Sequence, residues 1–273
     1  MGVNTESFHF LDINKDLFLN KKILTIGRQT NYIDQKILNK FGIPKEEYTD
    51  HIWIKRRKVN ILDSIDFSDY EGPTYTHDFN TPIDPNFHHQ YDIIFDGGSS
   101  EHMFNPVQAF YNYHDIIKTG GYYIGILPMN NHVNHGFYQF SPDFFYRFFS
   151  EERGYKTKCF VYKKGGWYMI KDLLSFPEVY HANLSISSYP NLIYVVAHKI
   201  GNKEVFLEYP KQTVYHNHLR NTNSSNIGKQ QNQKKPTLLQ KIYLFLVPKH
   251  IKDCIESYTI RKKMLIPVIK PIF

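Results

Sequence analysis

Histidine side chains occur in two polar segments that each follow an apolar stretch. His132 and His135 stand three residues apart in MNNHVNHGFYQFSP, residues 129–142, and His102 follows the apolar residues 93–95. Imidazole exchanges protons near neutral pH, so a histidine can accept the proton of a hydroxyl group that is being modified. These three histidines are our candidate catalytic residues. Three neighbours in the second segment are candidates for contact with a substrate: Asn131, Tyr138 and Gln139.

Two other interpretations of these histidines stay open. His102 could simply orient its loop through a hydrogen bond to the backbone. Alternatively, the segments offer ligand types that suit a divalent metal: Asp96, Glu101, His102, His132 and His135. One sequence does not show whether such side chains converge, and most groups of this kind hold no metal. We therefore predict a site without a metal ion.

Glycine and acidic residues end four of the predicted strands. These residues are Gly27, Asp66, Asp78 and Asp96, the last followed by Gly97 and Gly98. A glycine after the first strand lets the backbone approach a ligand, and an acidic residue at the end of the second strand can accept both hydroxyls of a ribose. In a mainly parallel sheet these ends lie along one edge, where ligands bind. We expect the site there.

The elements that position these residues alternate between strands and helices. Predicted strands are KKILTIG (21–27), a strand ending near Asp66, a short one ending at Asp78, a strong one ending at Asp96, YYIGILP (122–128), YKTKCFVYKK (155–164) and NLIYVVAHKIG (191–201). Predicted helices cover residues 30–41, capped by Thr30 or Asn31 and stopped by Gly42; residues 105–119, opened by Asn105 and Pro106 and closed by Gly120 and Gly121; and residues 141–154. This alternation predicts an α/β fold with a mostly parallel sheet and helices on both faces. The last two strands lack a helix between them, which predicts an antiparallel pair at the edge.

Composition divides the chain into three parts. We expect a main domain over residues 1–212, with an irregular aromatic insertion at about 165–188. Residues 213–236 are polar and poor in apolar residues, which predicts a flexible linker. Residues 237–273 are apolar and basic, and we expect short helices there, broken at Pro248 and Pro267. Such a tail could contact an anionic membrane surface or a second subunit.

Charge and cysteine content narrow the class of protein. The net charge of +7 is modest, and no continuous basic face with a nucleic-acid-binding module is present, so we expect no nucleic-acid partner. The two cysteines lie far apart without a CxxC motif, the start of the chain lacks a secretory pattern, and no apolar run is long enough to span a bilayer. The expected location is the cytoplasm.

Taken together, these segments resemble the class I S-adenosylmethionine-dependent methyltransferases over roughly residues 21–201. The resemblance lies in ILTIGRQ, SIDFSDYEG, THDFN, YDIIFDGGSSEHMFNP and KTGGYYIGILP. It implies a Rossmann-like, seven-stranded sheet that ends in an antiparallel hairpin, with S-adenosylmethionine (SAM) as the cofactor. EHMFNP followed by NHGFYQFSP is similar, more narrowly, to methyltransferase-like proteins of bacterial surface-polysaccharide (capsule) gene clusters. The helical tail would be an appendage to this sheet.

The resemblance also implies roles for individual residues. Gly27 would lie under the methionine moiety, Asp66 would hold the ribose, Asp78 would lie near the adenine, and residues 96–101 would line the methionine end. The full set expected to contact the cofactor is Gly27, Arg28, Gln29, Asp66, Asp78, Phe79, Asp96, Gly97, Gly98 and Glu101. The Arg28 cation would suit the methionine carboxylate. Glu101 could instead pair with Arg28 or cap a turn.

The first motif departs from the family pattern. The family usually has GxGxG, whereas this chain has GRQTN at residues 27–31. A nicotinamide-binding GxGxxG motif would need its third glycine at Tyr32. Three functions therefore remain: an O-methyltransferase acting on a sugar hydroxyl or a phosphate or phosphoramidate of a surface-glycan precursor, a non-catalytic binding or scaffold protein, and a nicotinamide-dependent sugar-modifying enzyme. A homodimer is compatible with each of them.

Overall fold

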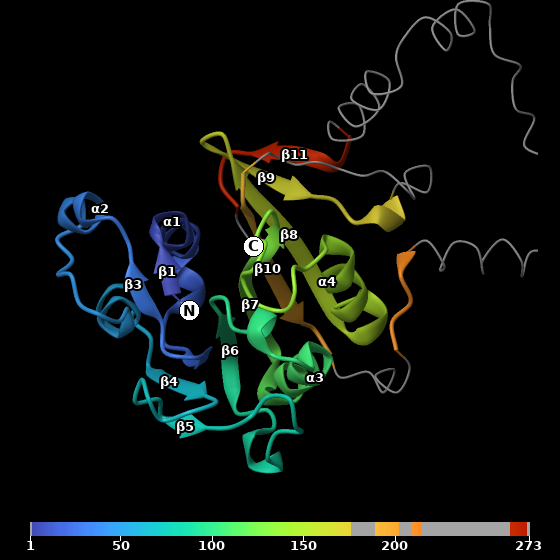
Figure 1. Ribbon diagram of the computed structural model, residues 1–273, viewed down its shortest axis with the longest axis horizontal. Coiled ribbons are helices and arrows are strands. Elements are labelled where there is room, and N and C mark those ends of the chain that lie inside the picture. Colours follow the sequence, from blue (N-terminus) through green and yellow to red (C-terminus); the bar gives the residue numbers. More distant parts are fainter. Residues whose placement is uncertain (1, 176–188, 202–208, 214–262, 272–273) are drawn as a thin grey trace, which may run out of the picture.

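The computed structural model describes residues 2–175, 189–201, 209–213 and 263–271 (Figure 1). Most of the expected linker and tail, and residues 176–188 of the expected insertion, lie outside this part. A nine-stranded sheet forms the centre, in the order β11-β9-β8-β10-β7-β6-β2-β4-β5. Its strands are β2 (Lys22–Ile26), β4 (Ile61–Asp66), β5 (Tyr75–Thr76), β6 (Tyr91–Asp96), β7 (Ile117–Asn130), β8 (Tyr155–Lys163), β9 (Gly166–Ile170), β10 (Asn191–Lys199) and β11 (Leu265–Val268).

The half of the sheet from β7 to β5 is parallel. β2 pairs in parallel with both β4 and β6, and β6 pairs in parallel with β7. β10 then pairs antiparallel with β7 on one side and with β8 on the other. The predicted α/β fold with a large central sheet is confirmed, but the sheet is not mostly parallel. It has nine strands rather than seven, and the pairings from β7 through β10, β8 and β9 to β11 are all antiparallel.

Two strands beyond β8 correct the sequence prediction. Residues 166–170, assigned to an irregular insertion, form β9, which pairs antiparallel with β8. Residues 265–268, assigned to a helical tail, form β11, which pairs with β9. β8 and β10 are therefore not an edge pair. Pro267 lies in the outermost strand, where a missing N–H leaves no ladder bond unmade. β9 was not predicted, because one of its two partner strands, β11, lies about 100 residues further along the chain.

Helices cover both faces of the sheet, as predicted (Figure 1). α3 (Pro106–Ile116) and α4 (Pro142–Phe148) pack on one face, around the fully buried Phe110. α1 (Thr5–Ile13) and the π-helical turn Ile52–Arg56 pack on the other face, around Trp53. The two apolar clusters fix the sheet between them, so the strand ends form a rigid edge.

The starts of α3 and α4 follow the predicted capping pattern. The Asn105 side chain accepts a hydrogen bond from the backbone N–H of Gln108, and that of Ser141 accepts one from Asp143. α3 ends at Ile116, earlier than predicted, because Ile117 pairs with Tyr91 of β6. The glycines at 120 and 121 instead lie within β7.

The helix predicted from residue 30 starts later. Residues Thr30–Tyr32 form β3, which pairs in parallel with β1 (Gly2–Asn4). α2 therefore covers only Gln35–Lys40, with Asp34 as its cap and Gly42 just beyond its end. The prediction of Thr30 or Asn31 as the cap was wrong, because a partner strand from the start of the chain holds these residues in extended form.

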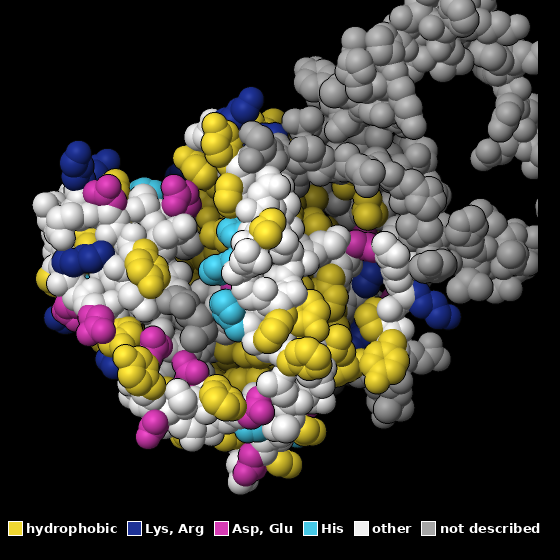
Figure 2. All heavy atoms as spheres, in the orientation of Figure 1, with side chains coloured by type: hydrophobic (Ala, Val, Ile, Leu, Met, Phe, Trp, Pro, Cys, Tyr) yellow, Lys and Arg dark blue, Asp and Glu magenta, His cyan; other side chains and the backbone are white. Residues whose placement is uncertain are grey.

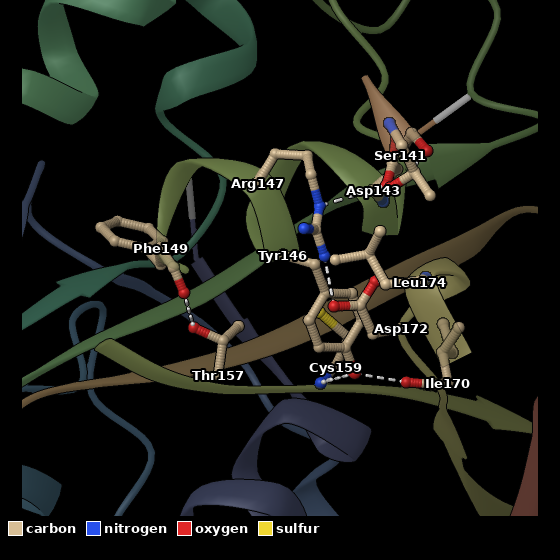
Figure 3. Close-up of polar contacts among 11 residues, drawn as sticks. Ser141, Asp143, Tyr146, Arg147, Phe149, Thr157, Cys159, Ile170, Asp172 and Leu174 are labelled. Carbon is tan, nitrogen blue, oxygen red and sulfur yellow. Dashed lines mark hydrogen bonds and ion pairs between the residues drawn. The ribbon is translucent and has the colours of Figure 1, made fainter. Parts of the chain in front are cut away.

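Polar contacts fasten α4 to the antiparallel part of the sheet (Figure 3). The Tyr146 hydroxyl donates to the Ile170 carbonyl and accepts from the Cys159 N–H at 3.3 Å. Arg147 forms ion pairs with Asp172 and with Asp143. Thr213, at the expected start of the linker, is buried and donates to Asp143.

None of the helices in the described part of the chain combines the length and hydropathy that crossing a membrane requires.

Candidate functional site

The order of the strands locates a switch point at the carboxyl ends of β2 and β6. From β2 the chain builds β4 and β5 on one side and then crosses to β6 and β7 on the other. In open α/β sheets, ligands bind in the crevice at such a point. Gly27 follows β2 and Gly97 follows β6, so both lie at the switch point. The structure thus brings these two predicted residues together.

Gln29 connects the two strand ends. Its side chain is 1% exposed, and its Nε2 donates to the carbonyl oxygens of Ile26 and Gly27, both at 3.0 Å. A Cβ at Gly97 would lie 2.0 Å from Gln29 Oε1, so the glycine is needed for this close approach. Among the described residues, no hydrogen-bond partner reaches that buried oxygen. The switch point therefore contains an unused acceptor.

The turn after β2 is held in a conformation that favours glycine. Gly27 has φ +70° and its N–H donates to Ile65 of β4 at 2.7 Å. Arg28 points to a different set of residues: it pairs with Asp50 at 2.8 Å, donates to the Glu71 carbonyl and stacks on the Tyr48 ring. The Arg28 cation is thus occupied by protein groups, and it does not pair with Glu101.

The acidic ends of β4 and β5 differ in how their carboxylates are used. Asp66 is half-buried, and one of its oxygens accepts from the Phe67 N–H at 2.6 Å. Asp78 accepts from both the backbone and the side chain of Asn80, which makes it a turn residue. Phe79 is 3% exposed and packs against Tyr113 in the core. Among the described residues, no hydrogen bond or ion pair links Asp66 or Asp78 to His102, His132 or His135.

Asp96 lies at the end of β6 with no exposed surface. Its carboxylate accepts from the Ser99 N–H at 2.8 Å, from the Ser100 hydroxyl and from the Tyr123 hydroxyl. Burial raises the pKa of Asp96, and these hydrogen bonds act against that shift. The residue is therefore better placed to shape the loop of residues 97–101 than to touch a ligand.

Glu101 and the predicted histidines form one cluster. Glu101 Oε1 lies 4.0 Å from His102 Nε2 and 3.7 Å from His135 Nε2. The His132 ring lies 5.7 Å from the His135 ring, measured between centroids. Glu101 is 1% exposed, whereas His102 and His135 reach the surface. Figure 2 shows histidine side chains in a row near the middle of the displayed face, with hydrophobic side chains beside them.

Burial sets the charge states in the cluster. It raises the pKa of Glu101 to about 8, helped by the nearby Asp96 carboxylate. It lowers the pKa values of His102 and His132, and the neighbouring His135 lowers both further. At neutral pH these two imidazoles are therefore held in the neutral form, which can accept a proton or bind a metal ion.

The loop after β7 is fastened to the loop after β6. The Glu101 carbonyl accepts from the N–H groups of Phe137 at 2.7 Å and Tyr138 at 3.2 Å. Gly136 has φ +76°, and a Cβ there would lie 2.7 Å from the same carbonyl. This contact between two distant segments brings His135 to Glu101.

The three candidates for substrate contact mainly support this loop. The Tyr138 hydroxyl donates to the Phe104 carbonyl at 2.9 Å, and Gln139 Oε1 accepts from the His132 N–H at 3.0 Å. Asn131 has φ +59° and donates to the Tyr189 carbonyl. Each nevertheless lies on the exposed side of the cluster.

Exposed aromatic residues border the site and were not among the predicted residues. Phe67 and Tyr70, one and four residues after Asp66, are 75% and 91% exposed. Phe104 and Phe137 are also exposed, and their rings meet edge to face at 5.7 Å beside the histidines. Their position immediately after acidic or histidine-bearing strand ends is the sequence signal that could have identified them.

Comparison with known proteins gives only structural matches. No protein-family model matches the chain, and no curated protein matches it. Similar solved structures include an S-adenosylmethionine-dependent methyltransferase from Mesorhizobium loti, at 12% identity over 41% of this chain and 48% of that one, with a TM-score of 0.28. The YcgJ protein from Bacillus subtilis matches at 12% identity over 70% of this chain and 97% of that one, with a TM-score of 0.41. A geranyl diphosphate methyltransferase in complex with SAM matches at 9% identity over 70% and 82%, with a TM-score of 0.37.

These likenesses are structural and distant. The chain spans about half of the first of these proteins, at 48% of its length.

Proposed function

We propose that this protein is a SAM-dependent O-methyltransferase whose acceptor is a sugar hydroxyl, or a phosphate or phosphoramidate group, of a surface-glycan precursor. The observation that carries the proposal is the switch point between β2 and β6, with Gly27 and Gly97 at the two strand ends and Asp66 on the next strand. This is the edge at which α/β sheets bind nucleotide-like ligands.

The residues of this edge fit such a cofactor at two positions. The second carboxylate oxygen of Asp66 accepts no hydrogen bond from the described residues, so it can accept from a ribose hydroxyl. Near Gly97, the buried Oε1 of Gln29 lacks a partner in the described structure, and an ammonium group would satisfy it. When bound, SAM supplies a methyl group on an activated sulfonium carbon.

The protein must then orient the acceptor and remove its proton. His132 Nε2 is buried, has no hydrogen-bond partner among the described residues and belongs to an imidazole that is neutral at pH 7. We assign it the role of taking the hydroxyl proton as the bond to the methyl carbon forms. The exposed rings of Phe104 and Phe137 offer a surface beside it against which the apolar face of a sugar can lie.

Titration calorimetry with SAM, S-adenosylhomocysteine and NAD tests the proposal. We expect both sulfur compounds to bind the full chain. Asp66→Ala should weaken that binding about 10- to 100-fold, the value of a hydrogen bond to a charged group. Asp69→Ala is the matched control, because Asp69 is exposed three residues further along the loop.

The outcomes separate the three functions. Absence of binding by either sulfur compound contradicts the proposal and favours a binding or scaffold protein. Binding of NAD alone favours a nicotinamide-dependent enzyme. If SAM binds, a panel of nucleotide-activated sugars and phosphorylated precursors identifies the acceptor, and His132→Ala should slow methyl transfer while SAM affinity stays unchanged.

A further inference from the structure

Three potential metal ligands converge in the cluster described above. Glu101 Oε1, His102 Nε2 and His135 Nε2 all lie within 4.8 Å of one another. A divalent ion bound at about 2.1 Å from each ligand in tetrahedral geometry separates the ligand atoms by about 3.4 Å. The two distances to Glu101 Oε1, 3.7 and 4.0 Å, exceed that value by a few tenths of an ångström. Small rotations of the two exposed imidazoles would bring their nitrogens into ligand range.

A second observation also points to a cation. Glu101 is 1% exposed, and no hydrogen-bond partner reaches its Oε2 among the described residues. Asp96, fully buried, is the largest charged influence on it, and in the described structure neither carboxyl pairs with a lysine or arginine. A buried carboxylate oxygen that no hydrogen bond satisfies is costly, and a bound metal ion would compensate it.

The surrounding backbone holds the three ligands in position. The Glu101 carbonyl accepts from Phe137 and Tyr138, which ties the loop of His135 to the loop of Glu101 and His102. Gly136 permits the close approach. The His102 and His135 side chains are 48% and 56% exposed, so the remaining coordination positions of an ion would face solvent.

We propose that Glu101, His102 and His135 bind one divalent transition-metal ion, with Zn²⁺ as the representative. Two imidazoles and one carboxylate suit zinc and its neighbours, whereas Mg²⁺ and Ca²⁺ prefer oxygen ligands. The open positions take an oxygen of the acceptor. This last role rests on the proposed methyl-transfer function, but metal binding itself does not. It also revises our expectation of a site without metal.

Metal titration of the full chain, purified without a histidine tag and stripped with a chelator, tests the site. We expect calorimetry with ZnCl₂ to give one tight site per chain. His102→Ala, His135→Ala and Glu101→Gln should each weaken it by more than the roughly 10- to 100-fold that loss of an outer-shell partner costs. The chain contains 14 histidines, so His88→Ala, outside the cluster, is the control and should bind like the wild type.

Two further measurements make the result decisive. Because the His135 side chain is exposed, His135→Ala without metal should have the same melting temperature as the metal-free wild type. Adding Zn²⁺ should raise the melting temperature of the wild type but not that of His135→Ala. Co²⁺ should give a visible absorption spectrum of low-symmetry coordination in the wild type and not in His135→Ala. Equal Zn²⁺ affinity in wild type and in the three variants, or no saturable binding, would overturn the site. SAM titrated in the presence of a chelator tests the proposed function independently.

Discussion

Gly136 permits the close approach of the two histidine-bearing loops, which are joined by hydrogen bonds from Phe137 and Tyr138 to the Glu101 carbonyl. Gly136 adopts φ +76°, a conformation that costs other residues about 1–2 kcal/mol. It also stands so close to Glu101 that a Cβ would lie 2.7 Å from its carbonyl oxygen. Gly120 has a similar φ of +83°, but a Cβ there would meet nothing within 4 Å. Alanine at Gly120 would therefore add backbone strain alone, whereas alanine at Gly136 would add the same strain and also push against the Glu101 carbonyl.

We predict that Gly136→Ala weakens Zn²⁺ binding, whereas Gly120→Ala does not. Both substitutions introduce the left-handed strain of about 1–2 kcal/mol, which urea unfolding of the metal-free proteins measures. Only Gly136→Ala also pushes the loop of His135 away from Glu101. Equal zinc affinities in the two variants would mean that the loop contact does not position the ligand.

At the scale of elements, the end of α3 is joined to the antiparallel strands by a buried polar group. His114 Nδ1 and the Tyr155 hydroxyl of β8 lie 2.8 Å apart, and Lys199 of β10 donates to the His114 carbonyl at 2.7 Å. Burial, with the nearby Lys199 cation, lowers the pKa of His114 from 6.5 to about 3. The junction is thus built around a neutral imidazole.

This junction predicts an acid-dependent loss of stability. Between pH 6.5 and about 3 the unfolded chain binds a proton at His114 and the folded chain does not. The stabilisation is therefore present above pH 6.5 and is lost as the pH falls, by about 1.4 kcal/mol per pH unit. Urea unfolding at pH 7, 6, 5 and 4 should show this slope in the wild type relative to His114→Gln.

The control for that series is His88→Gln, which removes a more exposed imidazole from the loop before β6. If wild type and His114→Gln lose stability in parallel from pH 7 to pH 4, His114 is not the group that titrates.

At the scale of the whole molecule, the chain closes on itself through its last described strand. β11 pairs with β9, the Lys171 N–H donates to the Met264 carbonyl at 3.0 Å, and Asn14 donates to the Pro271 carbonyl at 2.9 Å. The segment of residues 263–271 thus contacts both the sheet and the end of α1. It is part of the folded domain.

A chain ending at residue 262 should therefore be less stable. Met264 and Leu265 are 4% and 7% exposed, and burial of one such side chain contributes about 1.5–3 kcal/mol. The truncation also leaves β9 as an open edge, which favours aggregation. We expect a lower urea midpoint and a smaller soluble fraction. Ile269→Ser is the control, since that side chain is 97% exposed and should change stability by less than about 0.5 kcal/mol.

Elements that show a strong local pattern were predictable. β2, β4 and β6 were located by apolar runs that end in glycine or aspartate, and the starts of α3 and α4 by Asn-Pro and Ser-Pro pairs. β1, β3, β9 and β11 were not predicted, since each is short and is stabilised by pairing with a strand from another part of the chain. Local propensity carries little information about such strands.

For the site, the sequence by itself determined which residue types follow the strand ends, because the residues at a strand end are a local property. It could not determine which of them meet. The tertiary structure decided that Arg28 pairs with Asp50, that Gln29 reaches Gly97, and that Glu101 lies with His102 and His135. These contacts join residues whose separation in space depends on how the loops after β2, β6 and β7 pack together, and only the folded chain sets that packing.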